Sequence, residues 1–396
     1  MRGGVFKRGK TWSYTVYVGR DPATGRKRYK QRGGFATRRA CEDAVRQLVD
    51  RVRTGDYAEN GATTVRQFLE QWLTATTPTL RATTAASYRA MLEHHVEPAL
   101  GDTKLAKLTA LQLSSLYGEL LVSGYRKGNR SRGLSPTSVR YVHRIINRAL
   151  GDAVRWGMLG RNPAANVDPP RIARTEMATW SSSEVRAFLA SVADDRLYAM
   201  WVLLCTSGMR RGEVLGLRWD DVDLDAGRVA VRRALVEVGG YELQISEPKS
   251  ARSRRSVRLD ATTCAALARH RVAQLEERLE RGVGGRSDLA FTKPDGSLLQ
   301  PQHVSQAFGD RLHRAGLPTI RLHDLRHTAA TLALEAGIHP KVVSERLGHS
   351  TVQLTLDRYS HVVEGLQEAA ADRLGWVIFG DAPVSDVDPG RDVGEG

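Results

Sequence analysis

The stretch RLHDLRHTAAT, residues 321–331, carries His323 and Arg326 at a spacing of three, which places both side chains on one face of a predicted helix. The same stretch sets His323 and His327 four residues apart, which is the spacing of zinc-binding helices. The glutamate of the HExxH zinc motif is missing, however, and Arg326 would put a fixed positive charge beside the ion. No metal site is therefore expected on this helix.

A second stretch near the C-terminus, RLGHSTVQLTLDRYSH at residues 346–361, carries His349 ten residues before Tyr359. Each of these residues has an ordinary interpretation when taken alone. A tyrosine in a polar stretch is usually half-buried, and a polar residue on a helix usually faces solvent. The weight of the pattern therefore depends on what the rest of the chain adds.

Two earlier segments add further residues of the same chemical type. TSGMRRGEVLGLRW at residues 206–219 contains Arg210, and Glu213 follows one helical turn later, where it could orient a guanidinium group. EPKSARSRRSVRL at residues 247–259 places Lys249 at a turn between two predicted strands, from which a long amine can reach into a site.

The combination of these segments is typical of phosphoryl transfer. Two arginines can hold the non-bridging oxygens of a phosphate, histidines can donate hydrogen bonds beside them, a lysine can protonate a leaving oxygen, and a tyrosine can attack. The candidate catalytic residues are Arg210, Lys249, His323, Arg326, His349 and Tyr359.

Composition and cysteine usage narrow the class of protein. The 59 Lys and Arg against 44 Asp and Glu leave a net charge of +15, so nucleic acid is the leading partner. The three cysteines lie far apart and form neither a disulfide framework nor a CxxC metal knuckle, which favours a reducing compartment. No apolar stretch is long enough to span a membrane, and no GxxxxGK[ST] or GxGxxG motif supports nucleotide chemistry. No cofactor is expected.

Much of the positive charge precedes residue 37, where ten Lys and Arg face a single Asp. Alternating polarity at residues 11–18 and the return stretch KRYKQRGGF at residues 27–35 predict a small sheet. A helix at residues 37–52 should cover one face, with Ala40, Ala44, Leu48 and Val52 inward, and leave the other face basic and aromatic. A solvated surface is the alternative, but DNA contact is favoured, with the candidates Arg26, Lys27, Arg28 and Lys30.

A polar linker at residues 54–64 precedes a helical region. Thr64 with Gln67, and Thr109 with Gln112, fit the capping box that begins a helix. A further helix starts at Pro136, with a buried stripe of Val139, Val142, Ile146, Ala149, Leu150 and Ala153. The opposite side could follow DNA phosphates, although a solvated face explains such spacing about as often, and it carries Arg140, Arg144, Arg148 and Arg155.

A Pro-rich segment at residues 162–179 marks a second boundary, after which Ser181 with Glu184 should cap a helix. The remainder mixes helices with short strands in an α+β arrangement. The helices are predicted at residues 182–192, 196–206, 211–217 and 262–281 and across most of 303–371, and the strands at residues 228–236, 241–246 and 254–258.

The end of the chain is apolar and then acidic. The apolar run LGWVIF at residues 374–379 is expected to form a strand that packs either on its own subunit or on a neighbouring one. The acidic tail at residues 381–396 is expected to be disordered.

These segments resemble the Arg, Lys, HxxR, LGH and Tyr boxes of the tyrosine recombinase (phage integrase) family, and the likeness covers nearly the whole chain. It implies a multidomain fold. Residues 1–60 resemble an arm-type DNA-binding domain, which consists of a small β-sheet plus helix. Residues 63–170 resemble the all-α core-binding (SAM-like) domain. Residues 175–380 resemble the α+β tyrosine recombinase catalytic domain. All six candidate catalytic positions hold the residue type of the family.

The resemblance implies a site-specific DNA recombinase, an integrase that cleaves and rejoins DNA through a 3′-phosphotyrosine at Tyr359. Arg210 and Arg326 would hold the phosphate and Lys249 would act as general acid. The implied partner is double-stranded DNA at core and arm attachment sites, bound by a homotetramer without metal, cofactor or membrane. The implied location is cytoplasmic and nucleoid-associated. The alternatives are a catalytically silent DNA-binding protein and a type IB topoisomerase-like nicking and swivelling enzyme, and the basic N-terminal segment favours integration over swivelling.

Overall fold

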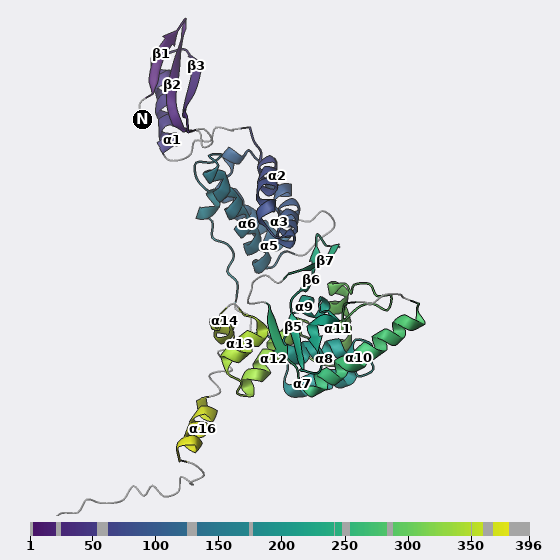
Figure 1. Cartoon of the computed structure of the whole chain (residues 1–396). Coiled ribbons are helices and arrows are strands. Elements are labelled where there is room, and N and C mark those ends of the chain that lie inside the picture. Colours follow the sequence, from purple (N-terminus) through teal and green to yellow (C-terminus); the bar gives the residue numbers. More distant parts are fainter. Residues whose placement is uncertain are drawn as a thin grey trace, which may run out of the picture. The chain divides into compact units, whose positions relative to one another are not determined.

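The computed structural model divides the chain into two compact units, residues 1–174 and 175–396 (Figure 1). Each unit is considered by itself. The residues that the structure describes are 3–20, 25–53, 62–124, 133–173, 177–240, 242–247, 254–282, 288–349, 351–358 and 367–379.

The N-terminal part is an antiparallel sheet with a helix packed against it. The strands β1 (Gly4–Arg8), β2 (Thr11–Arg20) and β3 (Lys27–Phe35) pair in that order, and α1 (Arg38–Arg53) follows. The helix buries Cys41, Val45 and Leu48 against Tyr14 and Val16 of the central strand. The stripe predicted through Ala40 is therefore wrong by one position at its start, because the larger side chain of Cys41 fills the core while Ala40 is exposed.

The strand register divides the basic residues of β3 between the two faces of the sheet. Tyr17 lies opposite Tyr29, with ring centroids 5.7 Å apart, and both lie on the face away from the core. Lys30 lies opposite the buried Val16, and Arg32 lies opposite the buried Tyr14. Directly opposed residues share a face, so this basic row projects on the same side as the core, along an edge strand. Lys27, two positions before Tyr29 on the same strand, lies on the open aromatic face, so the predicted basic and aromatic face is correct for Lys27 and wrong for Lys30.

The helical part of the first unit has its own core. Both predicted capping boxes are present, since the side chain of Thr64 accepts from the Gln67 amide and that of Thr109 accepts from the Gln112 amide. The buried stripe of the long helix is confirmed, and it packs with Phe68 and other apolar side chains. The elements are α2 (Val65–Thr76), η1 (Thr77–Thr79), α3 (Ala82–His95), α4 (Glu97–Leu100), η2 (Leu105–Lys107), α5 (Ala110–Val122), α6 (Pro136–Arg155) and η3 (Pro163–Asn166).

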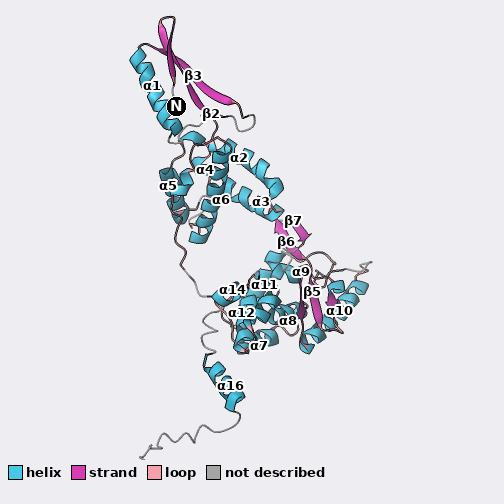
Figure 2. Ribbon diagram, turned by 60° about the vertical axis from the view of Figure 1, so that its left-hand side comes forward, coloured by secondary structure: helices cyan, strands magenta, loops and turns pink. Residues whose placement is uncertain are grey.

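The second unit is α+β, as predicted. Its helices in chain order are α7 (Ser182–Ser191), α8 (Tyr198–Ser207), α9 (Arg211–Leu215), η4 (Trp219–Asp221), α10 (Ala261–Glu280), α11 (Pro301–Ala315), α12 (Asp324–Glu335), α13 (Pro340–Leu347), α14 (Gln353–Arg358) and α16 (Gln367–Phe379). The strands are β4 (Val222–Asp223), β5 (Arg228–Val231), β6 (Ala234–Val238), β7 (Glu242–Ser246) and β8 (Arg255–Arg258). Figure 2 distinguishes these helices and strands by colour.

The strands form two separate small sheets rather than one. One has the order β4-β5-β8, and the other is the β6-β7 hairpin. The predicted strand at residues 228–236 is therefore two strands, which belong to different sheets. In consequence β7 and β8, the strands on either side of the Lys249 segment, also belong to different sheets.

The core of the second unit is built around α8. This helix is apolar on all sides, so it packs against α7, α10 and α12. Aromatic rings surround it, with Phe188 centred 5.3 Å from Phe308 and 5.4 Å from Trp180. The cap predicted for α7 is present, because Ser181 accepts from the Glu184 amide. The end of α8 is thereby fixed in a rigid core, and this end begins the candidate site.

Two expectations about the C-terminal end have different outcomes. LGWVIF is not a strand but the last part of α16, because the preceding QEAAADR is rich in strong helix formers that carry the helix forward. Its apolar side chains are largely exposed, for example Trp376 and Phe379. The acidic tail at residues 381–396 lies outside the described residues.

None of the helices in the described part of the chain has the length and apolar character needed to cross a lipid bilayer.

Candidate active site

Arg210 stands at a sharp turn between two helices. The last helical residue of α8 is Ser207, and Gly208 adopts the left-handed conformation with φ +65°, which glycine reaches without strain. Arg210 then caps the N-terminus of α9. Its backbone N–H and its Nη1 each donate to the Glu213 carboxylate at 2.8 Å. The prediction that Glu213 orients this guanidinium is confirmed, and the Arg210 side chain remains 40% exposed and open to a ligand.

Glu213 is itself buried and held from a second side. Arg255 of β8 donates from Nη1 to Glu213 Oε1 at 3.0 Å and from Nη2 to Oε2 at 2.9 Å. Burial by itself would raise the pKa of Glu213. The hydrogen bonds and charges of Arg255 and Arg210 outweigh burial and hold the pKa of this carboxyl below its usual range. Glu213 is therefore ionised at neutral pH and links two arginines.

Arg326 approaches the same turn from α12. Its side chain is buried, and Nη1 donates to the carbonyl of Gly208 at 2.8 Å. His323 is the N-cap residue of that helix, so it lies one position before the helix begins and not on the helix face as predicted. The residue is exposed. It lines a pocket of about 540 Å³ together with Arg210 and Arg321. The turn at Gly208 thus brings Arg210, Arg326 and His323 to one place.

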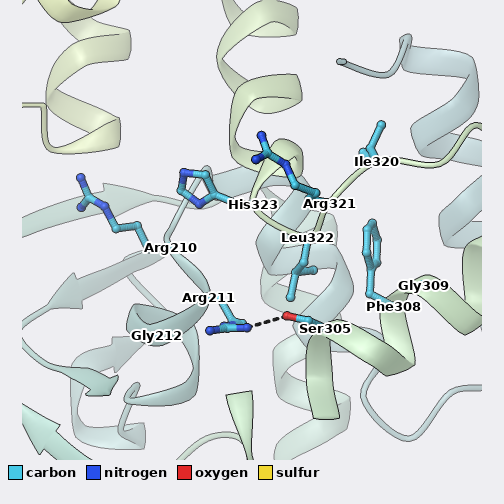
Figure 3. A pocket seen from close by; sticks show the side chains of 10 residues that line it. All are labelled: Arg210, Arg211, Gly212, Ser305, Phe308, Gly309, Ile320, Arg321, Leu322 and His323. Carbon is cyan, nitrogen blue, oxygen red and sulfur yellow. Dashed lines mark hydrogen bonds between the residues drawn. The ribbon is translucent and has the colours of Figure 1, made fainter. Parts of the chain in front are cut away.

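Figure 3 shows how this pocket is lined. The imidazole of His323 lies between the side chains of Arg210 and Arg321 in this view. Arg211 lines the same pocket, and its Nη1 donates to Ser305 Oγ at 2.5 Å and to the Pro301 carbonyl at 2.9 Å. The two adjacent arginines thus have different partners, Glu213 for Arg210 and α11 for Arg211.

His323 has an altered affinity for protons. Desolvation by the surrounding protein lowers its pKa most, and the positive charge of Arg326 lowers it next. Asp324 raises the pKa, and Arg210 and Arg321 lower it by smaller amounts. The imidazole is therefore neutral at neutral pH, with one nitrogen that can donate and one that can accept a proton.

The titration of His323 gives a direct check of this electrostatic environment. In ring-proton NMR of the DNA-free protein, its midpoint should lie below the ordinary histidine value of about 6.5. Arg210→Ala should raise that midpoint, because it removes one of the positive charges that disfavour the imidazolium ion. Arg228→Ala, on the exposed face of β5, serves as the control. A midpoint that does not respond to Arg210→Ala would show that the two side chains are not electrostatically coupled.

His349 follows the C-terminus of α13. Gly348 ends that helix in the left-handed conformation, with φ +70°, and the His349 amide donates to the Ser344 carbonyl at 3.0 Å. The His349 Nδ1 lies 2.8 Å from the hydroxyl of Thr355, a fully buried residue of α14. This contact fixes the ring on the helix that ends one residue before Tyr359.

The same helix end packs on both of the segments described above. A Cβ atom on Gly208 would lie 2.6 Å from Leu347 Cδ2, and one on Gly348 would lie 3.0 Å from Arg255 Nη1. Either distance is tighter than ordinary packing allows. The two glycines therefore let α13 approach the Arg210 turn and Arg255 closely, and His349 belongs to the same assembly.

Lys249 and Tyr359 lie outside the described residues. Their assignment rests on the sequence. In the described part of the second unit, Arg210, His323, Arg326 and His349 are drawn together by the ends of α8, α12 and α13. Among the residues that the structure describes, no group of three or more metal-ligating side chains occurs.

The four arginines predicted to follow DNA along α6 are all exposed. Two of them have structural partners. Arg155 pairs with Asp152, which also accepts from Trp72 Nε1 at 2.7 Å, and Arg148 lies over the Tyr88 ring at 5.9 Å. Arg140 and Arg144 complete the row on the same exposed face.

Arg255 was not singled out from the sequence, although a pattern pointed to it. Alternate residues of a strand share a face, and Arg255 has the same parity as the buried Val257. An arginine on the apolar side of a strand must be paired inside the protein. Arg346 is comparable, since its Nη1 donates to the Arg258 carbonyl at 2.8 Å and its Nη2 to the Thr206 carbonyl at 2.9 Å.

Three family descriptions match successive parts of the chain. Residues 5–51 match the Arm DNA-binding domain, residues 64–121 match the N-terminal SAM-like domain of phage integrases, and residues 181–365 match the Phage integrase family. The last match contains every candidate catalytic residue.

Relatives of known sequence agree with this assignment. The chain is 27% identical over 389 residues to a tyrosine recombinase XerC-like protein of Caldanaerobacter subterraneus subsp. tengcongensis, covering 93% of this chain and 97% of the relative. It is 28% identical over 255 residues to the ICEBs1 integrase of Bacillus subtilis, covering 64% of this chain and 69% of that protein. The chain belongs to the tyrosine recombinase (phage integrase) family of site-specific DNA recombinases.

Solved structures share the fold. The Tn1549 transposon integrase in complex with circular intermediate DNA superimposes with a TM-score of 0.65 at 21% identity, covering 79% of this chain and 100% of that one. A lambda integrase dimer bound to a core site gives a TM-score of 0.56 at 16% identity, covering 90% and 94%.

Proposed function

We propose that this chain is an integrase that cleaves and rejoins DNA at the attachment sites of a mobile element, through a 3′-phosphotyrosine at Tyr359. The observation that carries the proposal is the convergence of Arg210, Arg326 and His323 on the Gly208 turn. The names of the relatives support it, since they include the integrase of ICEBs1 and an integrase of the Tn1549 transposon.

The proposed reaction exchanges one phosphodiester for another. The Tyr359 oxygen attacks the scissile phosphorus, the bond from phosphorus to the 5′ oxygen breaks, and Lys249 gives a proton to that oxygen. A 5′-hydroxyl of the partner strand then attacks the phosphotyrosine, which releases the tyrosine and reseals the backbone. The number of phosphate ester bonds is unchanged, so no nucleotide cofactor is required.

The arginines supply what a tyrosine needs at neutral pH. A phenol with an unperturbed pKa of about 10 is mostly protonated there, so positive charge must favour its ionisation as it attacks. The guanidinium forks of Arg210 and Arg326 match the non-bridging oxygens of the pentacoordinate phosphorus better than a lysine would. His323 and His349 add hydrogen bonds or assist proton transfer.

Strand joining tests the proposed function against its alternatives. A core site taken from the DNA junctions of the element that carries the gene is prepared as a nicked suicide substrate, in EDTA. The wild-type protein should form a covalent adduct, and an added strand with a 5′-hydroxyl should then be joined to the DNA. A silent DNA-binding protein would give neither product. A type IB topoisomerase-like enzyme would also form the adduct and join the strand, but it would in addition relax supercoiled plasmid that lacks the site, which the integrase should not do.

We also propose the domain roles that the sequence predicted, with residues 1–60 on arm sites, 63–170 on core DNA and 175–380 in catalysis. Deleting residues 1–60 should leave cleavage of a short core site nearly unchanged, because the candidate catalytic residues lie elsewhere. The same deletion should abolish recombination that depends on flanking arm sites. Rates of both reactions, measured with the full chain as control, decide this point. Equal loss of both activities would mean that residues 1–60 belong to the core-site machinery.

The DNA contacts and the assembly are proposals of the same kind. Arg26, Lys27, Arg28 and Lys30 are the candidates on the sheet, and Arg140, Arg144, Arg148 and Arg155 are the candidates on α6. Exchange between two duplexes needs four active sites, so we propose a homotetramer on DNA, as in the lambda integrase tetramer bound to a Holliday junction. A protein that recombines chromosomal DNA must act where that DNA lies. We therefore propose a cytoplasmic, nucleoid-associated location.

A further inference from the structure

Arg255 lies outside the candidate catalytic set, and its buried guanidinium donates to two separate segments of the chain. Its Nη1 and Nη2 each reach one oxygen of Glu213, at 3.0 and 2.9 Å, and its Nε donates to the carbonyl of Arg346 at 2.6 Å. The side chain is only 6% exposed, and that of Glu213 only 4%. The guanidinium is thus directed at two separate segments of the chain at once.

These two segments carry different parts of the candidate site. Glu213 holds Arg210 through both its backbone N–H and its side chain. Arg346 begins the RLGH stretch, and Gly348 lies so close to Arg255 that a Cβ there would sit 3.0 Å from Nη1. Arg255 therefore connects the arginine turn to the helix end that bears His349.

We infer that Arg255 is a positioning residue, which sets Arg210 against the scissile phosphate by fixing Glu213 relative to the end of α13. The inference rests on the proposed function, because it assigns Arg255 a role in that reaction. Arg255 is buried behind Glu213 and does not line the pocket, so it acts through Arg210 and not on the DNA itself.

The geometry requires a guanidinium. Only a planar fork donates in parallel to both oxygens of one carboxylate and also presents a third N–H to a carbonyl on another side. A lysine at position 255 would keep the charge but could not make these three contacts together. The Glu213 carboxylate would then be held from the Arg210 side alone, so its position, and the position of the Arg210 guanidinium, would be less fixed. Misplacement of a catalytic group by about 1 Å can cost on the order of 100-fold in rate.

The test compares two substrates that differ in the charge of the scissile group. Adduct formation by wild type, Arg210→Ala and Arg255→Lys is measured on an ordinary phosphodiester and on a methylphosphonate, in which a methyl group replaces one charged non-bridging oxygen. Arg255→Lys should lower the phosphodiester rate by roughly 30- to 100-fold at an unchanged Kd for DNA. On the neutral methylphosphonate its rate should fall within about threefold of wild type, because an Arg210 fork has no anionic oxygen to hold there. Arg210→Ala should follow the same pattern.

The controls separate positioning from general damage to the fold. Arg228→Lys alters an exposed Arg–Asp pair on the same sheet and should leave both rates unchanged. If Arg255→Lys melts below the assay temperature, the double variant Arg255→Gln with Glu213→Gln removes both charges together and should show the same loss confined to the charged substrate. An equal loss on both substrates, or no loss on either, overturns the inference. Wild-type protein that forms no adduct and joins no strand would overturn the proposed function instead.

Discussion

Replacing Tyr359 with phenylalanine should abolish the covalent protein–DNA adduct, lowering its rate by roughly four orders of magnitude or more, as expected when a covalent nucleophile is removed. Phenylalanine keeps the ring and removes only the attacking oxygen. The residues that bind DNA are unchanged, so the Kd for a core site should stay within about twofold. Denaturing gel electrophoresis of a suicide-substrate reaction, beside a gel-shift titration, measures both quantities.

A matched tyrosine is available as the control. Tyr198, the first residue of α8, lies outside the candidate site. Tyr198→Phe should leave adduct formation unchanged. An adduct that persists at full yield in Tyr359→Phe would mean that another residue is the nucleophile, and mass spectrometry of the adduct peptide would then identify it.

Arg210→Ala should lower the cleavage rate by roughly 100- to 1000-fold, the usual cost of removing one group that stabilises developing negative charge. Arg210→Lys should recover little of this loss, because the amine keeps the charge but lacks the bidentate geometry. The Arg210 side chain is 40% exposed, so neither change opens a cavity in the core. Single-turnover adduct formation at saturating protein concentration measures the chemical step.

The fold must be shown to survive these substitutions. The melting temperature of Arg228→Ala should lie close to that of wild type, because both members of its ion pair are exposed. That of Arg210→Ala should fall moderately, because the buried Glu213 carboxylate loses one donor but keeps Arg255. Arg326→Ala is the informative contrast. Arg326 is buried and supports the Gly208 carbonyl, so its removal should lower both stability and activity. Full cleavage activity in Arg210→Ala would exclude Arg210 from contact with the phosphate.

Local features of this fold could be predicted from the sequence because their causes are local. The caps at Thr64, Thr109 and Ser181 each depend on two residues three positions apart, and the structure contains all three. The stripe of α6 follows from periodicity within a single helix. The pairing of Arg210 with Glu213 is local in the same sense.

Long-range features could not be predicted in this way. Arg255 and Glu213 are brought together by folding and are 42 positions apart in the chain. The division of residues 228–236 between two sheets depends on which partner strands are available. The residues of a short strand do not by themselves determine which strand it pairs with. The helical state of LGWVIF was missed because a short apolar run fits either a strand or a helix.

The ionised carboxylate of Glu213 also determines the lowest pH at which the Arg210 turn stays in place. Its folded-state pKa lies below the value of about 4.3 for a free glutamate, so it contributes stability above that unfolded value and loses it as the pH falls through the folded value. Acidification to mildly acidic conditions therefore leaves the Arg210 turn anchored. Any change in cleavage rate between about pH 5 and 7, where imidazoles commonly titrate, is expected to come from a histidine such as His323 and not from release of this anchor.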